Sequence, residues 1–370
     1  MNKSRILVTG GAGFIGCHLA HALLSRGHEV RVLDSLLDQV HGGQPPDPIL
    51  KNVELLVGDV RDPDAVARAV DGAEAVVHLA AEVGVGQSMY AVDRYVGTND
   101  LGTAVLLQAL LAHPVRRLVV ASSMSIYGEG LYRDSGGDLV EDVVRRPWRE
   151  TGSWDPVDGT GQKLIPLPTP ETKRQVLASV YAISKFVQER LILTVGKAYG
   201  MEAVALRLFN AYGPGQALSN PYTGVLAIFA SALLNGRPPQ VFEDGQQRRD
   251  FVHVQDVANA FVLALEAPKI AGGVYNIGSG LAVTIGEVAA EIALAMGRSD
   301  LRPEFLNKSR AGDIRHCFGD IRLARNELGY IPRRTFVDSL PELAEWVRRQ
   351  QTVHRVDEAR RELEVRGLVA

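Results

Sequence analysis

A tyrosine and a lysine four positions apart, Tyr181 and Lys185, have the clearest chemical potential in this sequence. At this spacing on a helix the two side chains share one face, so the ammonium group can sit close to the phenol. A phenol normally titrates near ~10, and a nearby positive charge lowers its pKa. We therefore expect Tyr181 to exchange protons near neutral pH. The spacing by itself is weak evidence, since it also occurs on ordinary solvated helices.

Serine hydroxyls in a second segment are placed to share this proton transfer. The run Ser122-Ser123-Met124-Ser125-Ile126-Tyr127-Gly128 follows an apolar stretch that is typical of a buried strand. Hydroxyl groups at the carboxyl edge of a parallel sheet face the ligand crevice. The alternative for any single serine is solvation in a loop.

A glycine-rich segment near the N-terminus has the spacing of a dinucleotide-binding turn. Gly10, Gly11, Gly13 and Gly16 satisfy both G-x-G-x-x-G and G-x-x-G-x-x-G, between a predicted strand and a predicted helix. Such glycines allow a tight turn and let the backbone approach a pyrophosphate, which the helix N-terminus attracts. The strand–turn–helix context is the support that this motif requires.

Two acidic residues are predicted to complete this site. Asp34 ends the second predicted strand, where a carboxylate binds the ribose hydroxyls of NAD. It would repel the 2′-phosphate of NADP, and Ser35–Leu37 offers no arginine to receive one, so we expect NAD. Asp59, at the end of the third predicted strand, either meets the adenine or caps the next helix.

The elements that must position these residues alternate along the first two thirds of the chain. Short, continuously apolar runs are separated by helix-length segments such as Phe14–Arg26, which Gly27 closes. Continuous runs are expected of parallel strands that helices cover on both faces. The pattern predicts an α/β fold built on a doubly wound parallel sheet. The expected strands are Arg5–Val8, Val30–Asp34, Val53–Gly58, Ala75–Leu79, Leu118–Ser122 and Ala203–Leu208.

The rhythm breaks at residues 129–170, which contain Pro147, Pro156, Pro166, Pro168 and Pro170. We expect a long insertion at the mouth of the site, either a passive surface loop or a substrate lid. Beyond residue 210 the pattern changes to short strands, turns and helices, which indicates a smaller mixed α/β substrate domain. The expected division is a cofactor domain at 1–209 with the insertion 129–170, a substrate domain at 210–350 whose residues 250–265 return to the first, and a helical tail at 351–370.

Composition excludes several classes of protein. The chain has 370 residues, 46% hydrophobic and 22% charged, with a net charge of -3, so nothing points to nucleic acid or an anionic membrane as partner. Cys17 and Cys317 are far apart and lack metal-ligand spacing, so we expect reduced thiols and no metal. We find no signal sequence and no apolar run that could span a membrane, so we expect a cytoplasmic protein.

Together these motifs resemble those of the extended short-chain dehydrogenase/reductase family, the NAD-dependent epimerases and dehydratases of nucleotide sugars. The resemblance runs from the glycine loop to about Val347 and includes His78–Ala81, Arg207–Asn210, Arg249–Val254 and Asn276–Ser279. It implies a Rossmann sheet with a smaller substrate domain, NAD as cofactor, a nucleotide-diphosphate sugar as substrate, and a homodimer.

The resemblance also implies roles for individual residues. Ser123, Tyr181 and Lys185 are the expected catalytic set, with Tyr181 as base. The expected cofactor-binding residues are Gly10, Gly13, Phe14, Ile15, Gly16, Asp34, Asp59, Val60, Leu79, Ala80, Ala81, Asn99, Tyr181 and Lys185. The expected substrate-binding residues are Ser123, Ser125, Asn210, Arg249, Arg310 and Arg315. Arginine suits a diphosphate because its planar fork makes paired, charge-assisted bonds, although each one could instead form a surface ion pair. Asn99 either holds a water or kinks the helix at Leu101–Leu111.

Departures from the family pattern indicate the subclass. The 4,6-dehydratases carry Thr-Asp-Glu where Ser123, Met124 and Ser125 stand, and decarboxylating relatives carry glutamate at the position of Ser125. Without these acids, a 4-epimerase acting on a UDP- or dTDP-hexose through a 4-keto sugar is the expected function. The segments 161–166, 219–224 and 312–318 resemble the dTDP-L-rhamnose 4-epimerase-type branch. The alternatives are a net oxidoreductase or a 4,6-dehydratase on the same fold, and a non-enzymatic NAD-binding protein.

Overall fold

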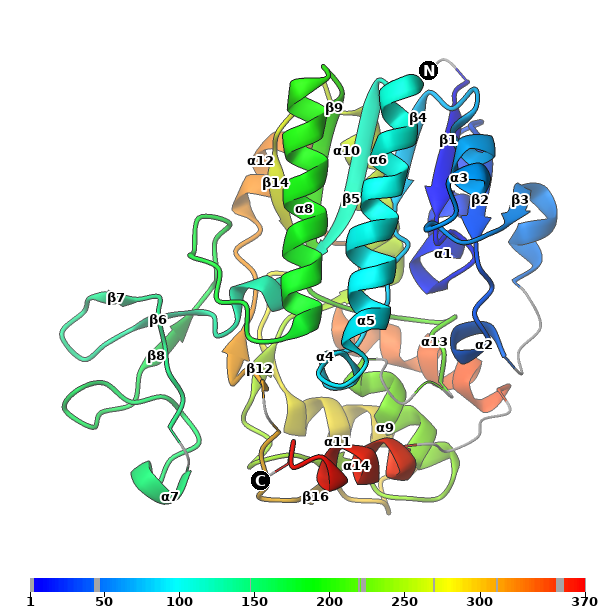
Figure 1. The fold of residues 1–370 in the computed structure, drawn as a ribbon. Coiled ribbons are helices and arrows are strands. Elements are labelled where there is room, and N and C mark those ends of the chain that lie inside the picture. The colour runs from blue at the N-terminus through cyan, green and yellow to red at the C-terminus, as the bar shows by residue number, and fades with distance from the viewer. Residues whose placement is uncertain are drawn as a thin grey trace.

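A parallel sheet of seven strands forms the centre of the computed structural model (Figure 1). Six of its strands match the predicted ones within two residues: β1 (Arg5–Thr9), β2 (Glu29–Asp34), β3 (Glu54–Val57), β4 (Ala75–His78), β5 (Arg117–Ser123) and β9 (Glu202–Leu208). The seventh, β14 (Val274–Ile277), was not predicted as a sheet strand. The order is β14-β9-β5-β4-β1-β2-β3, and every neighbouring pair is parallel. This confirms the predicted doubly wound sheet.

The structure describes residues 3–42, 47–146, 148–218, 220, 224–268, 270–310, 312–350 and 356–369. Pro147 of the insertion, and Ser219 and residues 221–223 of the branch motif, lie outside the described residues.

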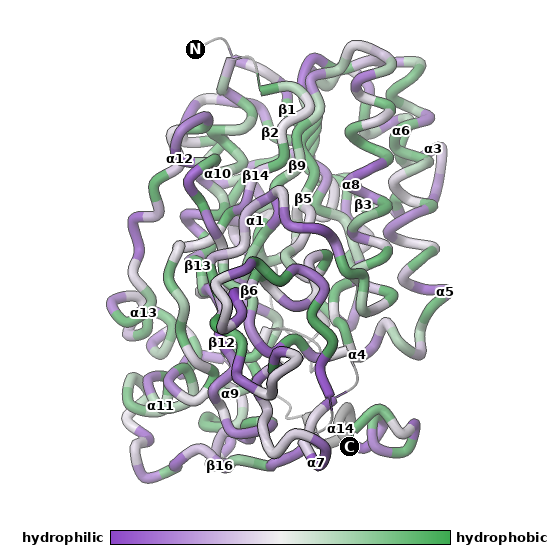
Figure 2. Tube along the Cα trace, turned by 90° about the vertical axis from the view of Figure 1, so that its left-hand side faces the viewer, coloured by the Kyte–Doolittle hydropathy of each residue, from purple (hydrophilic) through white to green (hydrophobic). Residues whose placement is uncertain are grey.

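Helices cover both faces of the sheet because its strands are apolar on both sides. One face packs against α1 (Phe14–Leu24), α10 (Val254–Glu266) and α12 (Arg322–Leu328). The other packs against α3 (Pro63–Val70), α6 (Gly102–Ala112) and α8 (Val180–Ala198). Hydrophobic residues gather along the strands between these helices (Figure 2). The two layers hold the carboxyl ends of the strands in fixed positions.

Short elements follow the carboxyl ends of the strands. They are α2 (Asp38–His41), a 3₁₀ turn at Pro48–Asn52, α4 (Val85–Ser88), α5 (Val92–Tyr95), a π-helical stretch at Val96–Leu101, and a 3₁₀ turn at Met124–Tyr127. The π-helical stretch runs directly into α6.

A second, smaller domain lies below the carboxyl edge of the sheet (Figure 1). Its helices α9 (Val225–Leu234), α11 (Ile285–Ala295) and α13 (Phe336–Arg348) share one apolar core. Its short strands are β10 (Asn210–Tyr212), β11 (Gln240–Val241), β12 (Arg248–Arg249), β13 (Phe251–His253), β15 (Val283–Thr284), β16 (Glu304–Phe305) and β17 (His316–Cys317). The predicted return of the chain at 250–265 corresponds to α10, which packs against α1. Two elements outside residues 250–265 also pack into the larger domain: strand β14, which joins the sheet, and helix α12, which covers it.

The insertion and the tail each contribute elements outside the sheet and its covering helices. The insertion contains an antiparallel sheet of β6 (Leu131–Arg133), β7 (Leu139–Val140) and β8 (Ile165–Leu167), and helix α7 (Trp148–Thr151). It projects from the body of the molecule (Figure 1). The tail forms α14 (Val356–Val365), at the lower end of the molecule in the same view.

Candidate active site

A single large cavity joins most of the predicted site residues. It measures about 1460 Å³ and extends from the glycine turn, along the carboxyl edge of the sheet, into the smaller domain. Ligands of doubly wound sheets bind at this edge, where the strand order reverses. Here that point lies between β1 and β4. All of the predicted site residues line the cavity except Asn99 and Arg315.

The glycine turn between β1 and α1 fits a pyrophosphate. Gly10 has a φ of 69°, and a Cβ there would lie 2.7 Å from the amide nitrogen of Ala80, so only glycine is tolerated. A Cβ on Gly13 would meet only Gly10 O, at 3.3 Å, and otherwise open space. Gly13 is also the N-cap of α1, where no side chain caps the helix and no acidic residue occupies the first turn. The helix N-terminus is therefore available to an anion, beside Phe14 and Ile15 on the cavity wall.

The acidic residues of the cofactor end are held in place by local bonds. Asp34 accepts from the amide of Ala12 at 3.0 Å through Oδ2 and from the amide of Leu36 at 2.9 Å through Oδ1. Asp59 lies beside Val60 on the cavity wall and pairs with Arg61 at 2.7 Å. The N-cap of α3 is Asp62 rather than Asp59, which removes the capping alternative for Asp59. The glycine turn and these two carboxylates therefore fit a dinucleotide such as NAD.

The catalytic candidates come together where β5 ends and α8 begins. Ser123 is the last residue of β5 and accepts two hydrogen bonds from Ser125, from its amide at 3.2 Å and its hydroxyl at 2.9 Å. Its own proton is thereby free to be donated elsewhere. Ser179 caps α8 by accepting from the amide of Ala182 at 3.1 Å, so the helix starts just before Tyr181. A hydrogen bond links Tyr181 with Ser123.

The prediction that Lys185 lowers the pKa of Tyr181 is wrong for the protein without cofactor. Burial raises the pKa of Tyr181, and only the hydrogen bond with Ser123 opposes this effect. Burial also lowers the pKa of Lys185 to about 7, against the attraction of Glu189. The ammonium group of Lys185 donates to Gln188 Oε1 at 2.7 Å. Desolvation therefore outweighs the expected charge effect, because both groups are taken out of water.

Gln188 was missed from the sequence because a glutamine on a helix carries no distinctive signal. Its side chain is fully buried beneath Lys185, and its amide nitrogen lies within hydrogen-bond distance of Thr103 Oγ1, His78 Nε2 and Ala80 O, at 3.0, 3.2 and 3.3 Å. Burial, followed by the charge of Lys185, lowers the pKa of His78 to about 3. A neutral, hydrogen-bonded layer thus supports Lys185 from below.

Asn99 lies in the π-helical stretch, fully buried and outside the cavity lining. Its Oδ1 accepts from the amide of Glu82 at 2.7 Å, and its Nδ2 donates to Ser184 Oγ at 2.8 Å. Asn99 therefore ties the loop after β4 to α8. Asn99 thus lies within a helix irregularity and does not line the cavity in which a cofactor would bind.

Polar side chains line the part of the cavity in the smaller domain. The Oδ1 atom of Asn210 is buried without a hydrogen-bond partner. Arg249 donates to the main-chain oxygens of Ile314 and Arg315, and Arg310 makes a bidentate pair with Asp313 at 2.9 and 3.0 Å. Both arginines line the cavity. This end of the cavity is suited to an anionic ligand with hydrogen-bond donors.

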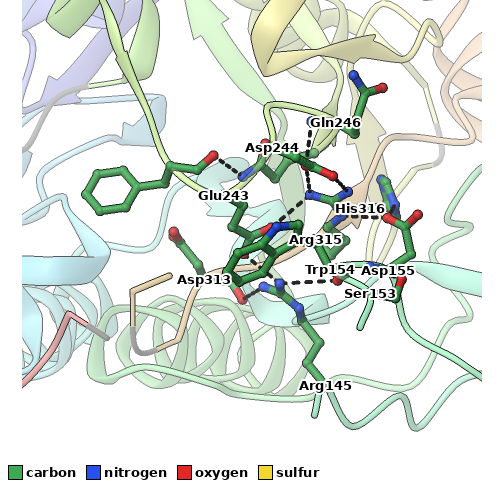
Figure 3. Close-up of polar contacts among 12 residues, drawn as sticks. Arg145, Ser153, Trp154, Asp155, Glu243, Asp244, Gln246, Asp313, Arg315 and His316 are labelled. Carbon is green, nitrogen blue, oxygen red and sulfur yellow. Dashed lines mark hydrogen bonds and ion pairs between the residues drawn. The ribbon is translucent and has the colours of Figure 1, made fainter. Parts of the chain in front are cut away.

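The placement of Arg315 differs from the prediction. Its side chain is fully buried and bonds to Asp155 at 2.7 Å, Glu243 at 2.8 Å and Asp244 at 2.7 Å (Figure 3). A guanidinium that makes four hydrogen bonds to three carboxylates, and that does not line the cavity, is not placed to bind a phosphate. Arg315 therefore leaves the set of proposed substrate-binding residues.

Two glutamines of the cavity wall were also missed. The Oε1 atoms of Gln216 and Gln247 are buried without a hydrogen-bond partner, as is the Oδ1 atom of Asn210. Both glutamines lie in loops, where no spacing pattern marks them. Orphaned acceptors in a cavity wall are suited to a ligand that carries N–H or O–H groups.

The insertion and the tail also differ in their relation to the cavity. No described residue between 129 and 170 lines it, so the structure does not support the substrate-lid alternative. Leu363 and Leu368 of the tail do line it. Among the described residues, no group of three His, Cys, Asp or Glu could hold a metal ion, and no helix is long and apolar enough to span a membrane. Cys17 and Cys317 are buried free thiols.

A doubly wound sheet with a glycine turn after β1, an aspartate at the end of β2 and a Ser-Tyr-Lys set is the arrangement of a dinucleotide-dependent enzyme of the short-chain dehydrogenase type. The model of the NAD dependent epimerase/dehydratase family matches residues 6–149 and 157–278. The chain belongs to this family.

Curated relatives and solved structures agree with this assignment. The chain is 34% identical over 353 residues to dTDP-L-rhamnose 4-epimerase of Burkholderia thailandensis, covering 94% of this chain and 96% of the relative. It is 32% identical to dTDP-glucose 4,6-dehydratase of Streptomyces niveus, covering 93% of both chains. The structure of Thermus thermophilus UDP-glucose 4-epimerase with NAD matches with a TM-score of 0.73 and 31% identity, over 94% of this chain and all of that one. NAD is accordingly the cofactor.

Proposed function

We propose that this protein is a nucleotide-sugar 4-epimerase that inverts C4 of a UDP- or dTDP-hexose. The observation that carries the proposal is the Ser123–Tyr181–Lys185 set at one edge of the cavity, with Met124 and Ser125 where dehydratases of the family carry acids. The similarity to the Burkholderia enzyme, which its name assigns to dTDP-L-rhamnose, makes a dTDP-6-deoxyhexose the first substrate to test.

The side chains act on the sugar 4-hydroxyl. Tyr181 removes the proton of this hydroxyl group. The hydroxyl of Ser123, whose oxygen accepts a hydrogen bond from Ser125, donates to the 4-oxygen of the sugar. When the amine of Lys185 is protonated, its positive charge stabilises the phenolate of Tyr181. Arg249, Arg310 and Asn210 bind the nucleotide-diphosphate part and leave the sugar free to turn at the 4-keto stage. Bound NAD supplies the hydride acceptor and donor at C4, and a positive charge that favours the phenolate.

Gly10, Gly13, Gly16 and Asp34 would hold the cofactor. The open space at the Cβ position of Gly13 and the uncapped N-terminus of α1 fit its pyrophosphate, and the fixed carboxylate of Asp34 fits its ribose hydroxyls.

Proton NMR in D₂O with dTDP- and UDP-hexoses, without added NAD, tests the proposal. A C4-inverted sugar that retains hydrogen at C4 is the expected product. Deuterium at C5 with loss of the 6-hydroxyl would identify a 4,6-dehydratase instead. In a second assay with NAD added, absorbance at 340 nm that grows with substrate would identify a net oxidoreductase that consumes NAD.

We also propose a homodimer, in keeping with the family resemblance. The supporting observation is an exposed apolar face across α5, the π-helical stretch and α8, at Val92, Val96, Leu101 and Ile183, whose exposures are 46%, 42%, 53% and 44%. A Leu101→Glu variant that stays dimeric in light scattering would contradict this face. A cytoplasmic location stays a prediction.

A further inference from the structure

The insertion at 129–170 is connected to the smaller domain by a buried cluster of charged residues (Figure 3). We call Glu129, Arg145, Asp155, Glu243, Asp244 and Arg315 the brace cluster. Three of them belong to the insertion and three to the smaller domain. Glu243 and Arg315 are fully buried, and Glu129 is 8% exposed. A buried charge is tolerated only when it is paired, so this cluster requires a fixed relation between the two segments.

The insertion makes several of its bonds to residues 313–316 of the smaller domain. Glu129 accepts from the amides of Arg315 and His316, at 2.6 and 3.1 Å. Asp155 accepts from Arg315 Nε at 2.7 Å and lies 3.3 Å from His316 Nε2. Arg145 donates to Glu243 at 2.5 Å and to Asp313 O at 3.3 Å. Both the main chain and the side chains of 313–316 are therefore held from the insertion side.

The opposite side of the same segment holds the two arginines of the cavity. Arg249 donates to the main-chain oxygens of Ile314 and Arg315. Arg310 is oriented by its bidentate pair with Asp313, and its guanidinium lies 4.5 Å from the centre of the Phe242 ring. Each arginine thus takes its position from atoms that the brace cluster fixes.

We propose that the insertion positions Arg249 and Arg310 for a diphosphate ligand, with Asp155 and Arg145 as positioning residues that never touch the ligand. This inference rests on the proposed function for the identity of the ligand. It replaces both readings of the insertion, the passive loop and the substrate lid. Asp155 lies between the two segments that the family model matches, which end at 149 and resume at 157.

Removal of the Asp155 charge tests this role with a matched control in the same insertion. Asp158 is partly exposed, and its carboxylate accepts hydrogen bonds from neighbours within the insertion, Ser135, Thr160 and Gln162. We expect Asp155→Asn to weaken the binding of UDP or dTDP about tenfold in calorimetry, and Asp158→Asn to leave it unchanged. Affinity for NAD should stay within twofold in both variants, because the glycine turn is remote from the cluster.

A double-mutant cycle separates positioning from general destabilisation. If Asp155 acts through both cavity arginines, Asp155→Asn should have a smaller effect on diphosphate affinity, about threefold, in an Arg249→Gln background, where only Arg310 remains to be positioned. Equal losses in both backgrounds would overturn the proposal, as would a Kd for Asp155→Asn that equals that of Asp158→Asn. Arg145→Gln, which removes the bonds to Glu243 and to the main chain of Asp313, provides the second variant if Asp155→Asn fails to bind NAD, and the same tenfold loss is expected.

The binding measurements stand apart from the catalytic proposal. If no hexose is epimerised but Asp155→Asn still weakens the binding of UDP or dTDP, the proposed function is wrong and the positioning role of the brace cluster is supported. If epimerisation occurs, we expect Asp155→Asn to raise KM about tenfold with kcat within twofold. A loss confined to kcat would contradict positioning of a binding group.

Discussion

Replacement of Lys185 by methionine should abolish activity and yet stabilise the folded protein at neutral pH. Burial lowers the pKa of Lys185 from its ordinary value of 10.5 to about 7 in the folded protein. Below pH 7 both folded and unfolded chains carry the charge, and the folded chain bears the full cost of burying it. As the pH rises from 7 to 10.5, only the unfolded chain still binds the proton, so this cost declines.

The magnitude follows from the pKa values. At about 1.4 kcal/mol for each pKa unit, the cost of the charge at pH 7 is roughly 4 kcal/mol, and at pH 10 it is below about 1 kcal/mol. Methionine keeps the apolar stem but leaves Gln188 Oε1 without its donor, which costs ~1–3 kcal/mol at any pH. The free energy of unfolding of Lys185→Met should therefore exceed that of the parent by about 1–3 kcal/mol at pH 7. At pH 10 this difference should be smaller by roughly 3 kcal/mol.

Urea unfolding of cofactor-free protein at the two pH values measures this difference. Lys197→Met is the matched control, because Lys197 is an exposed lysine of the same helix, and its effect should be small and independent of pH. A Lys185→Met variant that is less stable than the parent at pH 7, or whose gain is the same at pH 10, would refute the reasoning.

Three further outcomes are expected. Gly13→Val should weaken NAD binding at least tenfold, measured by calorimetry, with little change in melting temperature, since its side chain enters open cavity. Tyr181→Phe should lower kcat by about 10²–10⁴-fold with KM within severalfold, and a loss below tenfold would exclude Tyr181 as the base. Asp155→Asn should destabilise the protein most above about pH 5. The pKa of Asp155 is lowered by His316 and, against burial, by Lys163 and Arg315, so its contribution is lost as the pH falls below about 4. A pH-independent difference in acid unfolding would contradict this assignment.

Local patterns in the sequence were sufficient for the sheet and for the cofactor end of the site. The strands β1 to β5 and β9 are continuous apolar runs, and the glycine turn and Asp34 belong to one contiguous strand–turn–helix–strand unit. Their positions depend on neighbours in the chain, so spacing alone predicts them. The same holds for Tyr181 and Lys185, one turn apart on α8.

Tertiary structure decided what depends on segments far apart in the chain. The seventh strand β14 joins the sheet only beside β9, and the pKa values of Tyr181 and Lys185 follow from burial rather than from their spacing. Arg315 has the residue type and location of a phosphate ligand, yet Asp155 and Glu243 approach it from segments 160 and 72 positions away and remove it from the cavity. Desolvation and long-range charge pairing are set by the packed fold, and they leave no local pattern in the sequence.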